Sequence, residues 1–173
     1  MRQFFSVSVF VFVLLMSSFA QAGTAAECAQ LKSMEKVIKT ALADARKNYS
    51  KVQSAKADAQ KKIAAAKNAK ALWSKTRSSV HYNAFVTAKA AALRAIATYK
   101  TQAAVMQSKA RRVKSLITQM KSYAARIGSC KSSSGNQRSA RTTAQNVSVK
   151  VERIVKVMVQ NSPTNPLGFE GNF

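Results

Sequence analysis

The chain offers few residues for acid–base, nucleophilic or metal chemistry. It contains two cysteines, one histidine and six acidic residues among 173. A structural zinc site needs four nitrogen or sulfur ligands, and the cysteines and histidine supply three. His81 has no acidic residue close to it in sequence, and no nucleophile elbow or phosphate-binding loop occurs. We therefore expect a protein that is not an enzyme, with no metal, no cofactor and no small-molecule substrate.

The remaining chemistry belongs to the two cysteines, Cys28 and Cys130. In an oxidising compartment, an even number of cysteines in a small domain favours a disulfide. Two free thiols and a bond between two chains are the alternatives. The sequence predicts a Cys28–Cys130 disulfide within one chain.

The N-terminus indicates such a compartment. Arg2 is followed by an apolar run from Phe4 to Met16, and Ala20-Gln21-Ala22 is a small-x-small cleavage site. This is the pattern of a secretory signal peptide, and the run is too short to span a bilayer as a helix. We expect residues 1–22 to be removed and the remainder to be exported to the periplasm or the extracellular space.

Positive charge is the strongest signal of function. The chain has 29 lysines and arginines against six acids, a net charge of +23, and no acid lies between Ala59 and Val151. A surface of one sign attracts polyanions, and a rod of lysines can bind phosphates without reading sequence. We expect the partner to be an anionic macromolecule or surface, such as nucleic acid, an envelope glycolipid or an anionic membrane.

Two groups of residues are candidates for that contact. The first group lies on outer helical positions with no acid one turn away, and consists of Arg94, Lys100, Lys109, Arg111, Arg112, Lys114 and Lys121. The second group surrounds the expected turn of a helical hairpin and consists of Lys70, Trp73, Arg77 and Lys89. A solvated, frayed tip is the alternative interpretation of the second group.

These residues need long helices to position them. No glycine or proline occurs from Thr24 to Ile127, and strong helix formers dominate. Thr24 and Glu27 have capping-box spacing, and Gly128 stands where a glycine would end a helix. More than 100 residues are too many for one ordinary globular helix. The hydroxyl-rich segment 74–79 is the expected break, because its side chains compete for backbone hydrogen bonds and can cap a new helix.

Both arms keep a heptad period typical of a coiled coil. When the arms fold back around residue 79, facing residues have numbers that sum to about 158, which pairs Leu31 with Ile127 and Trp73 with Phe85. The two cysteines also centre on residue 79, so their disulfide would close the open end. We predict an all-α fold: a long antiparallel two-helix coiled-coil hairpin over 23–130, a shorter C-terminal helix and a flexible tail.

The last third has three parts. Residues 131–138 are rich in serine and predict a flexible linker. Residues 139–160 carry a helical apolar stripe and predict an amphipathic helix docked on the hairpin. The valines of 147–159 also alternate, which leaves a strand as the alternative. Residues 161–173 are expected to form a flexible tail, or else a docking peptide for a protein partner.

In its basic helical arms and secretory signal alone, the chain is similar to the periplasmic hairpin chaperones. That similarity implies a holdase whose cationic arms cradle unfolded clients. Those chaperones also have a strand-containing body that trimerises, and the helix starting near Thr24 leaves no room for their N-terminal strand. A membrane-active cationic secreted factor is a further alternative, with 139–160 as its insertion segment.

Overall fold

The computed structural model describes residues 24–131 and 137–163. The signal peptide expected over 1–22, the centre of the expected linker and residues 164–173 of the expected tail lie outside the described residues.

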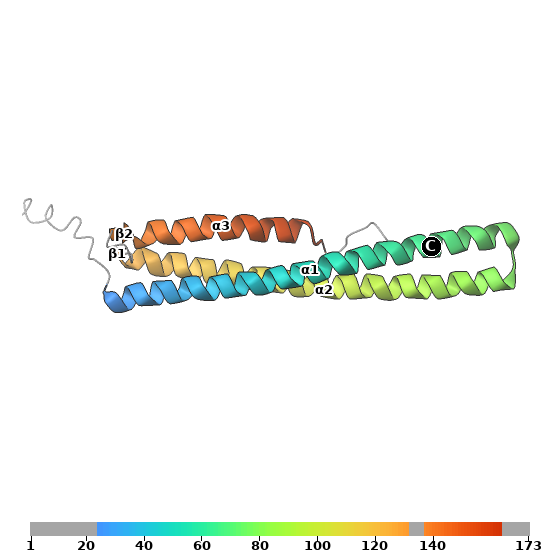
Figure 1. The fold of residues 1–173 in the computed structure, drawn as a ribbon, viewed down its shortest axis with the longest axis horizontal. Helices are drawn as coiled ribbons and strands as arrows, with labels where there is room; N and C mark the ends of the chain where they lie inside the picture. The colour runs from blue at the N-terminus through green and yellow to red at the C-terminus, as the bar shows by residue number, and fades with distance from the viewer. Residues whose placement is uncertain (1–23, 132–136, 164–173) are drawn as a thin grey trace, which may run out of the picture.

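Two long antiparallel helices form the body of the molecule. Helix α1 spans Ala25–Thr76 and helix α2 spans Ser79–Arg126, and they lie side by side along their whole length (Figure 1). The turn between them consists of Arg77 and Ser78, inside the predicted break. At 1.5 Å per residue, the 52 residues of α1 extend for about 78 Å. The all-α hairpin predicted from the heptads is confirmed.

The helix ends agree only in part with the predicted caps. Thr24 and Glu27 form the full capping box: the Glu27 N–H donates to Thr24 Oγ1 at 3.2 Å, and the Thr24 N–H donates to Glu27 Oε2 at 2.7 Å. Ser78 precedes α2, but its side chain makes no capping hydrogen bond. α2 ends at Arg126 with Ile127 as its C-cap, so Gly128 follows the cap as the sequence predicts, and the extended dihedrals of Ile127 lead the chain into a strand.

A short β-ribbon contains the two described ends of the predicted linker. Strand β1 (Ser129–Lys131) pairs antiparallel with β2 (Gln137–Ser139), so residues 131, 137 and 138 belong to strands. The carbonyl of Gly128 accepts a hydrogen bond from the Ala140 N–H at 3.0 Å, which ties the ribbon to the following helix. This pairing reverses the chain at the end of the hairpin.

Helix α3 spans Ala140–Gln160 and packs along α2 and α1 (Figure 1). Its buried residues are Ala140, Ala144, Ser148, Val151, Val155 and Met158. These follow the helical stripe seen in the sequence, so 139–160 is a helix and the alternative strand over 147–159 is wrong. A glutamate and basic residues occupy the solvent side of α3.

The predicted seam is the core of the hairpin. Leu31, Ile38, Ala45 and Val52 of α1 are buried, as are the α2 seam residues, which are Phe85, Ala92, Tyr99, Ala103, Met106, Ala110, Val113, Ile117, Met120 and Ala124. The main core cluster also includes residues of α3. Near the turn a second, smaller cluster contains Ile63, Ala66 and Ala92.

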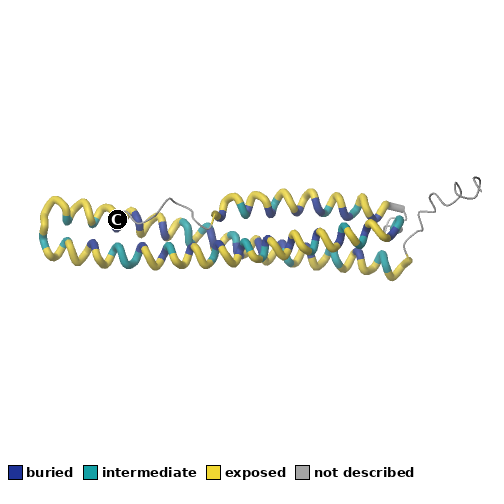
Figure 2. The backbone as a smooth tube through the Cα atoms, turned by 180° about the vertical axis from the view of Figure 1, so that it is seen from behind, coloured by how far each residue is buried: buried dark blue, intermediate teal, exposed yellow. Residues whose placement is uncertain are grey.

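The rod therefore has two unequal halves, visible in Figure 2. The half with the ribbon contains three helices, and we call it the three-helix half (24–53, 99–131 and 137–163). The half with the turn contains α1 and α2 alone among the described residues, and we call it the two-helix half (54–98). Seam lysines fall in the two-helix half: Lys56 and Lys89 are half-buried and Lys70 is exposed.

Cys28 and Cys130 form a disulfide in this structure, with Cα atoms 5.7 Å apart, and they are 102 positions apart in sequence. The bond joins the first turn of α1 to β1. It lies at the end of the rod opposite the turn, as the sequence predicts.

Candidate anion-binding surfaces

The seven basic residues singled out on α2 do not share one face. Lys109 points to α1, where it pairs with Asp44, and Lys121 points to α3, where it pairs with Glu152. Arg94, Lys100, Arg111, Arg112 and Lys114 are exposed. The structure thus spreads the group around the helix rather than gathering it into one patch.

Lys109 and Asp44 form a link between the two long helices. The Lys109 ammonium donates to Asp44 Oδ2, and this hydrogen bond is the main cause that lowers the pKa of Asp44 from its ordinary value of 3.8. The positive charge of Arg112 also helps to lower the pKa of Asp44. Both paired side chains are partly exposed, so the bridge adds little stability.

Lys121 and Glu152 form the matching link between α2 and α3. Lys121 Nζ lies 2.9 Å from Glu152 Oε1, and the Ser148 hydroxyl lies 3.0 Å from the same oxygen. The hydrogen bond from Lys121 is the main cause of the lowered pKa of Glu152. These acids lie far from their bases in sequence, so a search one helical turn along the chain could not find them.

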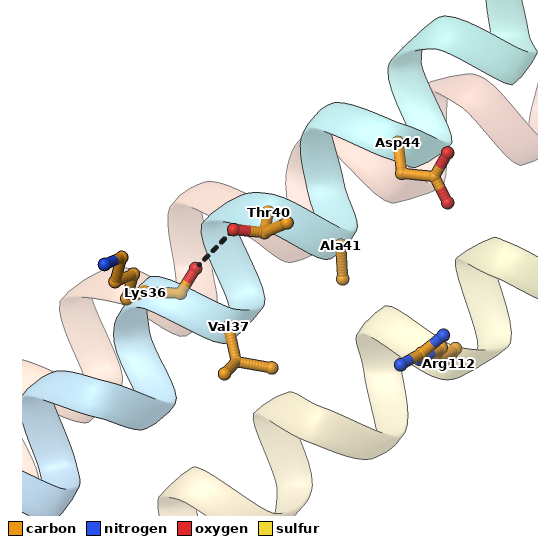
Figure 3. Close-up of a pocket in the computed structure, with 6 residues that line it drawn as sticks. All are labelled: Lys36, Val37, Thr40, Ala41, Asp44 and Arg112. Carbon is orange, nitrogen blue, oxygen red and sulfur yellow. Dashed lines mark hydrogen bonds between the residues drawn. The ribbon is translucent and has the colours of Figure 1, made fainter.

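A shallow groove of about 360 Å³ lies beside the Asp44–Lys109 pair. In Figure 3, Val37, Ala41 and Asp44 of α1 flank a space that Arg112 of α2 borders on the other side. Lys36 and Thr40 complete the lining. The groove combines the apolar side chains of Val37 and Ala41 with one acid and two bases.

The predicted tip residues are partly brought together. The Trp73 ring stacks on Phe85, with centroids 5.8 Å apart and an interplanar angle of 4°, and meets Tyr82 at 5.1 Å. The Arg77 guanidinium lies 5.6 Å from the Trp73 centroid. Lys89 is half-buried one turn beyond Phe85. The sequence predicted the Trp73–Phe85 pair, whereas the contact with Tyr82 depends on the tightness of the turn.

The turn itself is held by backbone and side-chain hydrogen bonds. Arg77 has a left-handed conformation (φ 51°, ψ 19°), and its N–H donates to the Trp73 carbonyl at 2.7 Å. Thr76 Oγ1 lies 2.6 Å from His81 Nδ1. His81, the one histidine of the chain, is therefore engaged in holding the turn.

Three side chains of the hairpin fix the end of α3, and sequence reasoning missed all of them. The carbonyl oxygens of 161, 162 and 163 each accept one hydrogen bond: from Gln53 Nε2 at 3.3 Å, from Gln107 Nε2 at 3.3 Å and from Tyr99 OH at 2.8 Å. Burial raises the pKa of the Tyr99 phenol. No signal in a single sequence marks these residues, since each lies at least 55 positions from its partner.

Within the described residues, no group of three or more histidines, cysteines or acids could hold a metal ion. None of the described helices is both long enough and apolar enough to cross a membrane. Comparison of the chain with family models, with curated proteins and with solved structures gave no match.

Proposed function

We propose that the protein is an exported, non-catalytic binding protein whose basic hairpin engages an anionic macromolecule or surface. Nucleic acid, an envelope glycolipid and an anionic membrane have the required chemistry. One observation carries the proposal: positive charge covers the whole length of the rod. The two-helix half has nine lysines and arginines against one acid, Asp58, and the three-helix half is also strongly basic.

An extended charge distribution suits an extended partner. A rod of about 78 Å can place bases along a polymer or a charged surface, and each neutralised phosphate releases counterions. Lys39, Lys109 and Lys121 form ion pairs with acids. The described residues contain five acids against 28 lysines and arginines, so most of the positive charge is not neutralised. The proposal includes no sequence-specific readout, because binding of this kind senses charge and spacing.

The test compares two triple variants that lose the same charge. R94Q/K100Q/R111Q removes exposed bases for which the described residues provide no ion pair, and K39Q/K109Q/K121Q removes the three paired lysines. Duplex DNA, lipopolysaccharide and anionic vesicles are titrated at several salt concentrations. On duplex DNA, if these bases bind phosphates, the first variant loses up to about 2.7 from the slope of log affinity against log salt, at about 0.9 per contact. The second variant, K39Q/K109Q/K121Q, loses less of this slope.

Equal losses for the two variants would show that net charge alone matters. Absence of binding to every anion at low salt would refute the proposal. An unfolded outer-membrane protein is titrated in parallel, because the holdase hypothesis expects this client to bind in preference to the polyanions. Trimers in sedimentation would also favour the holdase.

A further inference from the structure

One row of α2 side chains changes character where α3 ends. The row consists of residues seven apart, which in a coiled coil return to the same side of the helix, namely Val86, Leu93, Lys100, Gln107, Lys114 and Lys121. Lys121 contacts Glu152 of α3 and Gln107 contacts the Ser162 carbonyl, so this row faces α3. We call it the α3-facing row.

The row is polar where α3 covers it and apolar where α3 is absent. Lys100 to Lys121 lie in the three-helix half, whereas Val86 and Leu93 lie in the two-helix half. Leu93 is 49% exposed and Val86 is 45% exposed, and Tyr82, four residues before Val86, is 46% exposed. Tyr82, Val86 and Leu93 thus form one strip on the side of the hairpin that α3 leaves uncovered. We call it the apolar strip.

The end of α3 directs the chain toward this strip. Gln107 holds the Ser162 carbonyl and Tyr99 holds the Pro163 carbonyl, so successive residues step along α2 toward the turn. Ser162 is fully buried at this point. Pro163 itself is exposed, and its carbonyl lies against Tyr99 of α2, six residues from Leu93 at the start of the apolar strip.

We propose that residues 164–173 continue along α2 toward the turn and cover the apolar strip. The segment reads Thr-Asn-Pro-Leu-Gly-Phe-Glu-Gly-Asn-Phe and supplies three large apolar side chains, Leu167, Phe169 and Phe173. Fully extended, ten residues span about 33 Å. The distance along α2 from Tyr99 to Tyr82 is about 26 Å at 1.5 Å per residue. The segment is long enough to reach the whole strip.

The charge of segment 164–173 is also complementary to that of the two-helix half. The segment carries one charged residue, Glu170, and the two-helix half carries nine bases against one acid. The glycines at 168 and 171 let the backbone approach the helices closely. This proposal does not depend on the proposed binding of anions.

The first test measures protection of the segment in the oxidised full-length chain. Chymotrypsin cleavage after Leu167 and Phe169 is followed by mass spectrometry in wild type, in V86K/L93K and in the control V105K/V149K. The control also places two lysines at exposed valines, which are 39% and 47% exposed, outside the strip. Cleavage of a docked segment follows its undocked population. If the docked state is favoured about ten-fold over the undocked state, wild type and control should be cut about ten-fold more slowly than V86K/L93K.

The second test identifies the occupant directly. A photoreactive benzoylphenylalanine at position 93 should crosslink within one chain to a peptide from 164–173. Crosslinks that join two chains, together with a dimer in sedimentation that V86K/L93K dissociates, would assign the strip to a second copy and overturn the proposal. Equal cleavage of wild type and V86K/L93K would overturn it as well.

Discussion

Reduction of the Cys28–Cys130 bond is the perturbation with the largest calculated effect. The bond closes a loop across 102 positions of sequence, and the two helices inside that loop make up most of the described chain. In the chain-entropy model, closing a loop of this length lowers the entropy of the unfolded state and stabilises the fold by about 4.7 kcal/mol. At about 2–4 °C per kcal/mol for a chain of this size, the melting temperature should fall by about 10–20 °C on reduction.

The assay compares thermal melts by far-UV circular dichroism for oxidised protein, reduced protein and the variant C28S/C130S. The variant should melt with the reduced protein, and reductant should leave its melt unchanged. If the oxidised and reduced melts coincide, or if C28S/C130S melts with the oxidised protein, the disulfide does not stabilise the hairpin and the reasoning is wrong. The polar substitution is tolerable because both cysteines are only partly buried.

Three further predictions concern the core, the end of α3 and the response to acid. Ile38→Ala should destabilise the fold by about 2–5 kcal/mol in urea unfolding, because Ile38 is fully buried in the main core, whereas a Val80→Ala control at an exposed position should change little. Tyr99→Phe should cost about 1 kcal/mol by the same measurement, since it leaves the Pro163 carbonyl without its donor. The fold lowers the pKa of Asp44 from its ordinary value of 3.8 and the pKa of Glu152 from its ordinary value of 4.5. These two carboxylates therefore stabilise the fold fully only above those ordinary values, and stability should fall as the pH drops below them. The variant K109Q/K121Q should lose less stability than wild type as the pH falls below 4.5. If the variant and wild type lose the same stability, the two ion pairs do not have this role.

The features that the sequence predicts best are those that depend on the spacing of residues along the chain. The heptads place Ile38 and Met106 in the seam, and both are fully buried. The cysteine count predicts the disulfide, and the position of Cys28 and Cys130 about residue 79 agrees with the register that the heptads predict. The heptad pattern recurs along both arms, and the cysteine positions agree with it independently. A single residue that departs from the pattern therefore does not change the predicted fold.

The features that could not be predicted depend on how the helices are rotated against each other. The pairing of Asp44 with Lys109 joins residues on different helices, so only the folded arrangement brings them together. The ribbon after Gly128 depends on main-chain pairing between β1 and β2, which the serine-rich sequence does not signal. The tip illustrates both cases: Trp73 and Phe85 follow from the register, whereas the left-handed Arg77 depends on the geometry of a two-residue turn.

The disulfide also decides how the molecule would respond to a mechanical load. α1 and α2 are joined by a peptide turn at one end and by Cys28–Cys130 at the other, so together they form a covalently closed ring. A pulling force applied between Thr24 and Pro163 passes through the sulfur atoms and bypasses the ring. The load then falls on the ribbon and on α3, which would peel from the hairpin while the two long helices stay intact. Under reducing conditions the same force would instead unzip α1 from α2.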